Sequence, residues 1–589
     1  MLRDDIAVRL AGESGEGVIS GGDILTTGAA RAGYWGLTFR TYPAEIKGGP
    51  CMYQVRVGTD PLCSQGNTVD LLICFNQEAF DLHHHELADD GHIVCDAESV
   101  RVTPKFESRS SEAPLGSLAQ EAGGSRRGKN LVSVGLVCGL IGIDTAPIEE
   151  FILRRYAHKG DVGEANIKSL RAGVEFARDK LPDGAHKLSP PKVADGERVL
   201  MSGNQAICIG SLAAGLNYYA GYPITPASDI LEWLSGRLPC FGGVAVQTED
   251  EIAALASVLG ASYAGRKAMT ATSGPGLSLM SELVGLAGMA EIPAVIIDAQ
   301  RAGPSTGMPT KTEQSDLNHA LYGGHGEAPR VVMAPTSVED CFTVIVEAFN
   351  AAERYQVPVI LLSDQSLSHR METVNRPDLG SIEVIDRVTA NGSDNGSYDR
   401  YRIAEDGVSP MAVPGGPGAH VSTGIEHDEA GHPHYEPELH EAMMSKRFGK
   451  LEPLAAEGRI TFSGPDKADV GILGWGSTEG AALEAAEILL DRGLKASICY
   501  PRVLAPLPVE RIREWAERMG RVVVPELNVT GQFARLVRAD VEIALESVAK
   551  ATGLPFTAAQ IADYITDGTH PTDHSGAWEP GRTGEARVG

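Results

Sequence analysis

The sequence is poor in cysteine and in basic charge. Its nine cysteines are scattered over 589 residues and none forms a CxxC pair, so no disulfide framework, zinc site or set of iron–sulfur ligands is predicted. Lysine and arginine total 51 against 78 aspartates and glutamates. The resulting net charge of -27 argues against binding to nucleic acid or to anionic membranes, because both require basic patches.

Long hydrophobic runs are also missing. The longest nearly apolar run, LVSVGLVCGLIGI at 131–143, is too short to span a bilayer and is typical of a buried helix. The first residues, MLRDDIAVRLAG, lack the layout of a signal peptide, and we expect a cytoplasmic protein. The length, with 43% hydrophobic and 22% charged residues, predicts several globular domains.

Apolar strands alternate with helical patterns along most of the chain, which predicts an α/β protein of several domains. The glycine turn GESGEGV follows the first predicted strand, and several strands of the second unit end in turn or polar residues. The predicted parts are an α/β domain at 1–184, a linker at 185–200, an α/β domain at 201–384, an irregular connecting region at 385–465, an α/β domain at 466–566 and a disordered tail at 567–589.

Several motifs resemble functional sites but each lacks a requirement. GGSRRGKN at 123–130 resembles a P-loop, yet Asn130 stands where Mg²⁺ coordination requires Ser or Thr, and no strand precedes the motif. Three adjacent histidines at 83–85 fan outward on a helix and cannot share one metal ion. GESGEGV departs from GxGxxG, so close packing or another ligand is favoured over a dinucleotide. For the loop histidines His427, His432 and His434, a solvated loop is favoured over a metal site.

The strongest group of polar residues lies at predicted strand ends in the second unit. In YYAGYPITPAS, Pro223 and Pro226 stiffen the loop and place Thr225 at the carboxyl edge of a strand. Ligands bind at this edge in open α/β sheets. A proline-rich turn that only closes an αβ unit is the alternative at this point.

Three further features point to the same edge. Glu249 to Glu251 precede a helix of small residues, where a carboxylate either caps the helix or binds a ligand. TSGPG at 272–276 ends the next strand with a bend. Arg301 follows another strand and is suited to bind a carboxylate as a fork. Together with Thr225 they predict one site.

GYPITPAS, EIAALASVLGASYAG, TATSGPGLSLMSE and QRAGPSTGMPT together resemble the α subunit of 2-oxoacid:ferredoxin oxidoreductases, most closely those that act on 2-oxoglutarate. The resemblance extends over nearly the whole chain. The first unit, with GESGEGV and TYPAEIKGG, resembles the γ domain of the family fused ahead of α, and GWGSTEGA and PELNVTGQ resemble its transketolase-C-like domain. For the second unit it implies a doubly wound α/β domain of the pyrimidine type, which binds thiamine diphosphate.

The resemblance also implies roles for individual residues. Glu251 is implied to be the catalytic carboxylate bonded to the aminopyrimidine of the cofactor, with Glu249 as the fallback. Lys47 is implied to face the distal end of the substrate, where a cation suits a dicarboxylic 2-oxoacid such as 2-oxoglutarate. The other implied substrate-binding residues are Thr225, Arg301 and Thr310, and the other implied cofactor-binding residues are Tyr222, Pro223, Ile224, Ser273 and Gly274.

Two absences agree with the resemblance. The chain has no GDG followed by a downstream Asn to hold Mg²⁺ and diphosphate, and it has no cluster cysteines. In the family both lie on a separate β subunit, so the resemblance implies Mg²⁺ and a [4Fe-4S] cluster on that subunit, an (αβ)₂ heterotetramer, coenzyme A as co-substrate and ferredoxin as electron acceptor. We expect the chain alone to be inactive. A pyruvate, branched-chain or aryl-pyruvate enzyme, a non-catalytic scaffold and a dinucleotide-dependent dehydrogenase remain alternatives.

Overall fold

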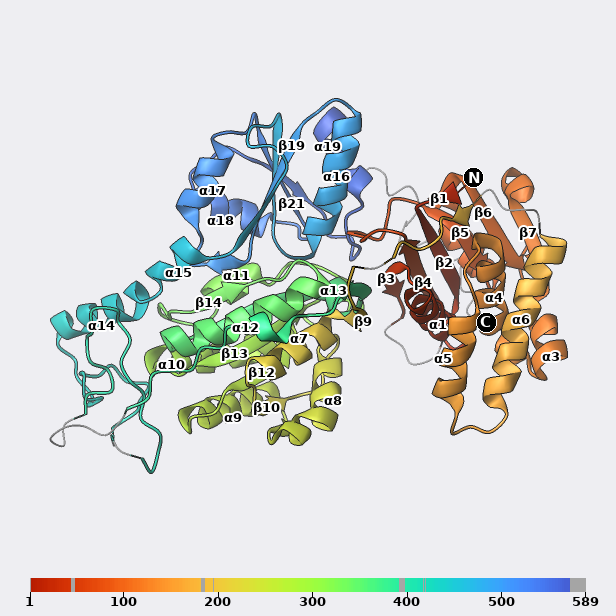
Figure 1. Ribbon diagram of the computed structural model, residues 1–589. Helices are drawn as coiled ribbons and strands as arrows, with labels where there is room; N and C mark the ends of the chain where they lie inside the picture. Colours follow the sequence, from red (N-terminus) through yellow and green to blue (C-terminus); the bar gives the residue numbers. More distant parts are fainter. Residues whose placement is uncertain are drawn as a thin grey trace, which may run out of the picture.

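The computed structural model describes residues 2–43, 48–181, 186–193, 195–390, 398–416, 418 and 420–572. Three α/β units follow one another along the chain, and the region around α14 (Pro437–Gly449) projects from the second unit (Figure 1). The multidomain α/β class predicted from the sequence is therefore confirmed. Lys47 and the part of the predicted tail from 573 onward lie outside the described residues.

The first unit is built on an eight-stranded mixed sheet in the order β7-β6-β5-β2-β4-β3-β16-β9. Its helix α4 contains most of the apolar run at 131–143 and is buried, as predicted. The strands are β2 (Asp5–Glu13), β3 (Trp35–Thr41), β4 (Pro50–Gly58), β5 (Val69–Cys74), β6 (Leu87–Asp96), β7 (Ser110–Ala113), β9 (Arg198–Ser202) and β16 (Met371–Asn375). The helices are α1 (Val18–Arg31), α2 (Gln77–His83), α3 (Leu115–Gly123), α4 (Lys129–Ile141), α5 (Ala146–Tyr156) and α6 (Val162–Lys180), and β1 (Leu2–Arg3) pairs with β8 (Lys187–Leu188).

Strands from either end of the second unit extend this first sheet. β9 and β16 pair antiparallel over five residues, and Glu372 of β16 pairs with Leu37 of β3. The Met371 amide donates to Thr38 Oγ1 at 2.8 Å, and the Gly36 amide donates to Thr373 Oγ1 at 3.1 Å. The first two units therefore share a continuous hydrogen-bonded sheet.

The second unit has a seven-stranded sheet in the order β11-β10-β12-β13-β15-β14-β20, parallel except for the antiparallel pair of β14 and β20. β11 lies on one side of β10 and β12 on the other, so a topological switch point lies between β10 and β12. The strands are β10 (Tyr218–Gly221), β11 (Val244–Gln247), β12 (Ala268–Thr272), β13 (Ala294–Gln300), β14 (Val331–Met333), β15 (Pro358–Asp364) and β20 (Val503–Ala505). The helices are α7 (Gly203–Ala213), α8 (Ser228–Arg237), α9 (Glu251–Tyr263), α10 (Gly274–Met289), α11 (Leu317–Tyr322), α12 (Val338–Tyr355) and α13 (Gln365–His369).

The third unit has a five-stranded sheet in the order β17-β19-β18-β21-β22 and lies against the second unit (Figure 1). The chain reaches it through α14 and α15 (Glu452–Glu457), and α14 is anchored by Lys446, whose ammonium pairs with the buried carboxylate of Glu291. The strands are β17 (Ile460–Ser463), β18 (Val470–Leu473), β19 (Ala496–Pro501), β21 (Val522–Glu526) and β22 (Glu546–Ala549). The helices are α16 (Glu479–Asp491), α17 (Val509–Ala516), α18 (Gln532–Asp540) and α19 (Ala558–Asp567).

Within the described part of the chain, no helix has both the length and the apolar character needed to cross a membrane.

Candidate active site at the switch point

The loop after β10 carries Thr225 beside the switch point. Its position is fixed from two sides: Arg301 Nη1 donates to the Thr225 carbonyl at 2.8 Å, and Asn204 Nδ2 donates to the Pro226 carbonyl at 2.9 Å. The Thr225–Pro226 peptide bond is cis. The prolines thus place Thr225 at the strand edge, as the sequence predicts, and the structure brings it together with Arg301. Of the neighbouring loop residues, Tyr222 and Pro223 are exposed and Ile224 is half-buried.

The three carboxylates of QTEDE have different environments. Asp250 caps α9, because its side chain accepts a hydrogen bond from the Ala253 amide at 2.7 Å. Glu251 is the first residue of the helix and only 6% exposed, whereas Glu249 is exposed. No hydrogen bond from a described residue reaches the Glu251 carboxylate. The capping role therefore belongs to Asp250, and Glu251 is the buried carboxylate that is left to bind a ligand.

The turn TSGPG lies directly beside Glu251. A Cβ atom on Gly276 would lie 2.7 Å from Glu251 Oε1 and 2.0 Å from Thr272 Oγ1, so only glycine allows this approach. Ser273 is fully buried before α10, and its hydroxyl has no hydrogen-bond partner. Because buried hydroxyls are normally paired, this orphan hydroxyl indicates a polar ligand at the turn. A carboxylate, a free hydroxyl and a close-packed glycine turn fit the polar edge of a flat heterocycle such as an aminopyrimidine.

Arg301 is 8% exposed at the end of β13, and its Nε atom has no partner. Burial lowers the pKa of its guanidinium, while the charges of Asp316 and Asp298 act in the opposite direction. Burial raises the pKa of Asp298 well above its usual range and raises that of Asp316 to about 6. Sequence reasoning missed both aspartates. One feature of the sequence could have pointed to Asp298: it lies inside the otherwise apolar strand AVIIDAQ, and aspartates are rarely buried without a partner.

Thr310 connects the site to the first unit. Its hydroxyl donates to the Tyr42 carbonyl at 2.8 Å, so the structure places Thr310 at the contact between the two units. The Tyr42 hydroxyl lies 3.1 Å from His369 Nδ1. Burial and Arg40 lower the pKa of His369 to about 3, so this imidazole is neutral at physiological pH. Lys47, predicted to face the same region, lies outside the described residues.

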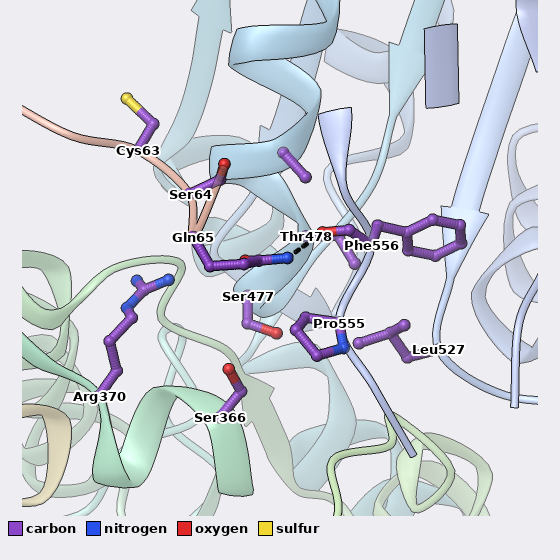
Figure 2. A pocket seen from close by; sticks show the side chains of 11 residues that line it. Cys63, Ser64, Gln65, Ser366, Arg370, Ser477, Thr478, Leu527, Pro555 and Phe556 are labelled. Carbon is purple, nitrogen blue, oxygen red and sulfur yellow. Dashed lines mark hydrogen bonds between the residues drawn. The ribbon is translucent and has the colours of Figure 1, made fainter. Parts of the chain in front are cut away.

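A small cavity lies where the three units meet, lined by Gln65 of the first unit, Arg370 of the second and Phe556 of the third (Figure 2). Its volume of about 10 Å³ is enough for one water molecule. Gln65 Nε2 donates to the Phe556 carbonyl at 2.8 Å across the junction. A larger groove of about 410 Å³ runs along α12. None of the switch-point residues Thr225, Glu251, Ser273 and Arg301 lines it.

In the first unit, the motif GESGEGV and the P-loop-like segment GGSRRGKN are in contact through an ion pair. Glu16, in GESGEGV, accepts hydrogen bonds at Oε2 from the Glu13 amide at 2.8 Å and from Asn76 Nδ2 at 3.0 Å, and it pairs with Lys129. Lys129 is the lysine of the P-loop-like segment. The carboxylate of the chain itself therefore lies where a phosphate would have to approach, and this position does not favour a dinucleotide.

His83, His84 and the loop residue His427 have hydrogen-bond partners within the chain. The ring nitrogens of neighbouring histidines have different partners: His83 lies against Arg9 and Glu86, and His84 Nδ1 lies 2.9 Å from the Phe80 carbonyl. In the loop, His427 Nδ1 lies 2.9 Å from the Ile425 carbonyl. Over the described ranges, no group of three or more His, Cys, Asp or Glu residues is placed to hold a metal ion.

Three family models match the chain in the predicted order. They are pyruvate ferredoxin/flavodoxin oxidoreductase at residues 7–176, the thiamine diphosphate-binding pyruvate flavodoxin/ferredoxin oxidoreductase domain at 209–446 and the transketolase C-terminal domain at 462–562. Subunit KorA of 2-oxoglutarate oxidoreductase from Mycobacterium tuberculosis is 34% identical, covering 95% of this chain and 91% of that protein. The chain belongs to the 2-oxoacid:ferredoxin oxidoreductase family.

Other members agree over a similar length. The α subunit of 2-oxoacid:ferredoxin oxidoreductase 2 from Aeropyrum pernix is 33% identical, covering 95% of this chain and 97% of that subunit. A solved structure of 2-oxoglutarate:ferredoxin oxidoreductase from Magnetococcus marinus, with 2-oxoglutarate, coenzyme A and succinyl-CoA bound, is 41% identical and superposes with a TM-score of 0.91. It covers 96% of this chain and 100% of its own. The family predicted from the sequence, with the γ-type domain fused ahead of α, is confirmed.

Proposed function

We propose that this chain is the γα-fused subunit of an enzyme that oxidatively decarboxylates 2-oxoglutarate to succinyl-CoA and CO₂, with transfer of two electrons to ferredoxin, or runs the reverse carboxylation. The observation that carries the proposal is the set of polar groups at this edge of the sheet. The buried Glu251 carboxylate lies beside the turn TSGPG, the unpaired Ser273 hydroxyl lies on that turn, and the buried Arg301 is bonded to the Thr225 loop. Family membership supports the reaction class. The relatives named for 2-oxoglutarate support the substrate.

Glu251 and the turn TSGPG are the groups that would hold the aminopyrimidine side of thiamine diphosphate. Bound there, the cofactor supplies a nucleophilic carbon and an electron sink for the decarboxylation. Glu251 is only 6% exposed to solvent. Its carboxylate would therefore hold or release a proton at the aminopyrimidine with little competition from water. Ser273 Oγ would donate or accept a hydrogen bond at the same edge, and Gly274 leaves room for the side chain of Asp316 beside the turn.

Arg301 and Thr225 are the groups that would bind the 2-oxoacid. Arg301 is already held through Nη1, and its free Nε would donate to the substrate carboxylate. A loop that is fixed before the substrate arrives lowers the entropy cost of orientation. Thr310 and the Tyr42 loop would close the site from the first unit, and Lys47 stays the predicted contact of the distal carboxylate.

The groups that this chain lacks belong, in our proposal, to a β subunit. That subunit would carry Mg²⁺ with the diphosphate and a [4Fe-4S] cluster, and an (αβ)₂ assembly would pass electrons to ferredoxin and the acyl group to coenzyme A. The sequence offers neither GDG with a downstream Asn nor CxxC. The cytoplasmic location predicted from the sequence stays a prediction.

The test is a panel of 2-oxoacids assayed with the chain co-purified with its β partner, with CoA-dependent reduction of a viologen dye as readout. Turnover with 2-oxoglutarate well above that with pyruvate, branched-chain and aryl 2-oxoacids supports the proposal. Preference for pyruvate would keep the reaction class and discard the substrate. A stable, cofactor-loaded complex without turnover on any 2-oxoacid would point instead to a non-catalytic scaffold.

A further inference from the structure

Two buried aspartates, Asp298 and Asp316, lie near enough to the proposed substrate arginine for their charges to act on it. Asp298 lies on β13, fully buried between Thr272 of β12 and Leu362 of β15. Asp316 lies before α11, where its amide donates to Gln300 Oε1 at 3.1 Å. A Cβ atom on Gly274 would lie 2.7 Å from Asp316 Oδ2, so the pair reaches the turn TSGPG.

Neither carboxyl group has an ordinary partner. No donor reaches either oxygen of Asp298 or the buried Oδ2 of Asp316, and no described lysine, arginine or histidine forms an ion pair with either residue. Burial, the nearby charge of Asp316 and a hydrogen bond between the two side chains raise the pKa of Asp298 well above its usual range. A hydrogen bond between two carboxyl groups exists only if one of them carries a proton, and two bare carboxylates at this distance would repel each other strongly.

The charged groups that face the pair are few. Asp298 faces Asp316 and Arg301, and Asp316 also faces Glu313, which is buried and whose pKa is raised by burial. Among the described residues, Arg301 is the cation whose charge acts on both aspartates, and its unpartnered Nε marks the adjacent anion site.

We propose that Asp298 and Asp316 share one proton and act together as a positioning pair that sets the charge Arg301 presents to the 2-oxoacid carboxylate. Asp298 carries the proton and donates it to the Asp316 carboxylate, so the pair holds one negative charge and balances the buried guanidinium. Neither aspartate takes part in the chemistry. The inference rests on the proposed binding of a 2-oxoacid at Arg301.

The sign of the pH dependence follows from the pair. With the pKa of Asp316 near 6, the pair is neutral below that pH and carries one negative charge above it. A neutral pair leaves the charge of Arg301 uncompensated, and it then attracts the substrate carboxylate more strongly. The KM for the 2-oxoacid should therefore rise about three- to tenfold between about pH 5 and pH 8, as expected for one charge a few ångströms from the arginine.

The first test measures the proton itself on the full-length chain. The infrared difference spectrum between the wild type and Asp298→Asn at neutral pH should contain the carbonyl stretch of a protonated carboxyl group, because the amide replaces the protonated member. Taking the difference cancels other buried carboxyl groups. A spectrum without that band would overturn the proposal.

The second test uses the complex with the β partner. Asp298→Asn keeps the charge on Asp316 and should retain the rise of KM with pH, whereas Asp298→Asn/Asp316→Asn should show a flat KM at the low-pH value with kcat nearly unchanged. Calorimetry in two buffers of different ionisation enthalpy should show that the wild type takes up a fraction of a proton on binding 2-oxoglutarate, and that the double variant does not.

The outcomes separate the two proposals. The same slope of KM and the same proton uptake in the double variant as in the wild type would overturn the role of the pair, even though the enzyme works. A wild-type complex that binds and turns over no 2-oxoacid would overturn the proposed function. The infrared band would still decide whether the two aspartates share a proton.

Discussion

Adjacent residues of the same type have different roles at this site, and burial explains the difference. In the run Glu249–Asp250–Glu251, the first is exposed, the second caps α9 and the third is buried against the turn TSGPG. Only the third is both shielded from water and without a hydrogen bond from a described residue. A carboxylate in that position can be matched to a single ligand atom.

Replacing Glu251 tests this distinction. Glu251→Gln keeps the shape but removes the ionisable group, so turnover of the complex should fall by about 100-fold or more, the range of general acid–base catalysis. Viologen reduction by saturating 2-oxoacid and CoA measures the loss. The matched control is Glu249→Gln, which should stay within about twofold of the wild type. If Glu249→Gln lost turnover and Glu251→Gln did not, the carboxylate that acts at the aminopyrimidine would be Glu249.

At this scale the sequence predicted what local chemistry determines. The proline spacing predicted an extended loop for Thr225, and the strand ends predicted that Thr225 and Arg301 meet, which the structure shows. It could not predict that Asp298 and Asp316 face each other, because their contact depends on how the chain returns to β13 after the loop at 301–316. The bond from Thr310 to Tyr42 likewise joins segments 268 residues apart.

Between elements, two glycines on neighbouring helices differ in what surrounds them. Gly276 on α10 faces Thr272 and Glu251, and a side chain there has no space. Gly260 on α9 is exposed, and a Cβ there would meet nothing within 4 Å. The first glycine sets the distance between α9 and α10, whereas the second is only a helix residue with high conformational entropy.

Alanine at these positions should therefore have opposite effects. Gly276→Ala should lower the stability by about 1–3 kcal/mol through overpacking and displace Glu251, with a loss of turnover. Gly260→Ala should stabilise the protein by up to about 1 kcal/mol and leave turnover unchanged. Thermal unfolding and the viologen assay report the two effects. Equal behaviour of the two variants would mean that the turn does not position Glu251.

The α/β character of the second unit was accessible from βα alternation, because strands joined by crossover helices run parallel. The extension of the first sheet by β16 and β9 was not accessible. β3 and β16 are more than 300 residues apart, and the register of a single residue pair leaves no local signal in either strand. Pairings of this kind depend on the docking of whole units.

In the whole molecule, the Glu484 carboxylate makes several of the hydrogen bonds that join the first and third units. Glu484 on α16 accepts hydrogen bonds from Arg56 Nη1 at 2.6 Å, from the Ser64 amide at 2.9 Å and from Ser64 Oγ at 2.7 Å. Burial lowers the pKa of Arg56, but the charges of Glu484 and Asp5 outweigh this effect and raise it. Glu487, one turn later on the same helix, is exposed.

Removing the Glu484 carboxylate should loosen this contact. Glu484→Ala leaves the Ser64 amide without its acceptor and removes one carboxylate from Arg56, which keeps Asp5 and the Ser64 carbonyl, so the stability should fall by about 1–3 kcal/mol. The midpoint of urea unfolding, followed by a probe in the first unit, measures the change. Glu487→Ala on the same helix should shift the midpoint little. A midpoint unchanged in Glu484→Ala would show that the other contacts between the two units, such as the bond from Gln65 to the Phe556 carbonyl, are sufficient to hold them together.

In our proposal, this chain and a β subunit form the active site together. The most direct test measures 2-oxoglutarate turnover with thiamine diphosphate, Mg²⁺, CoA and viologen. It compares the purified chain, the β partner alone and the two combined. We expect no turnover from either chain alone and full activity on mixing, because this chain supplies Glu251 and Arg301 but neither the diphosphate motif nor the cluster cysteines. Turnover by the purified chain without its partner would contradict the proposal that its site is only half of the active centre.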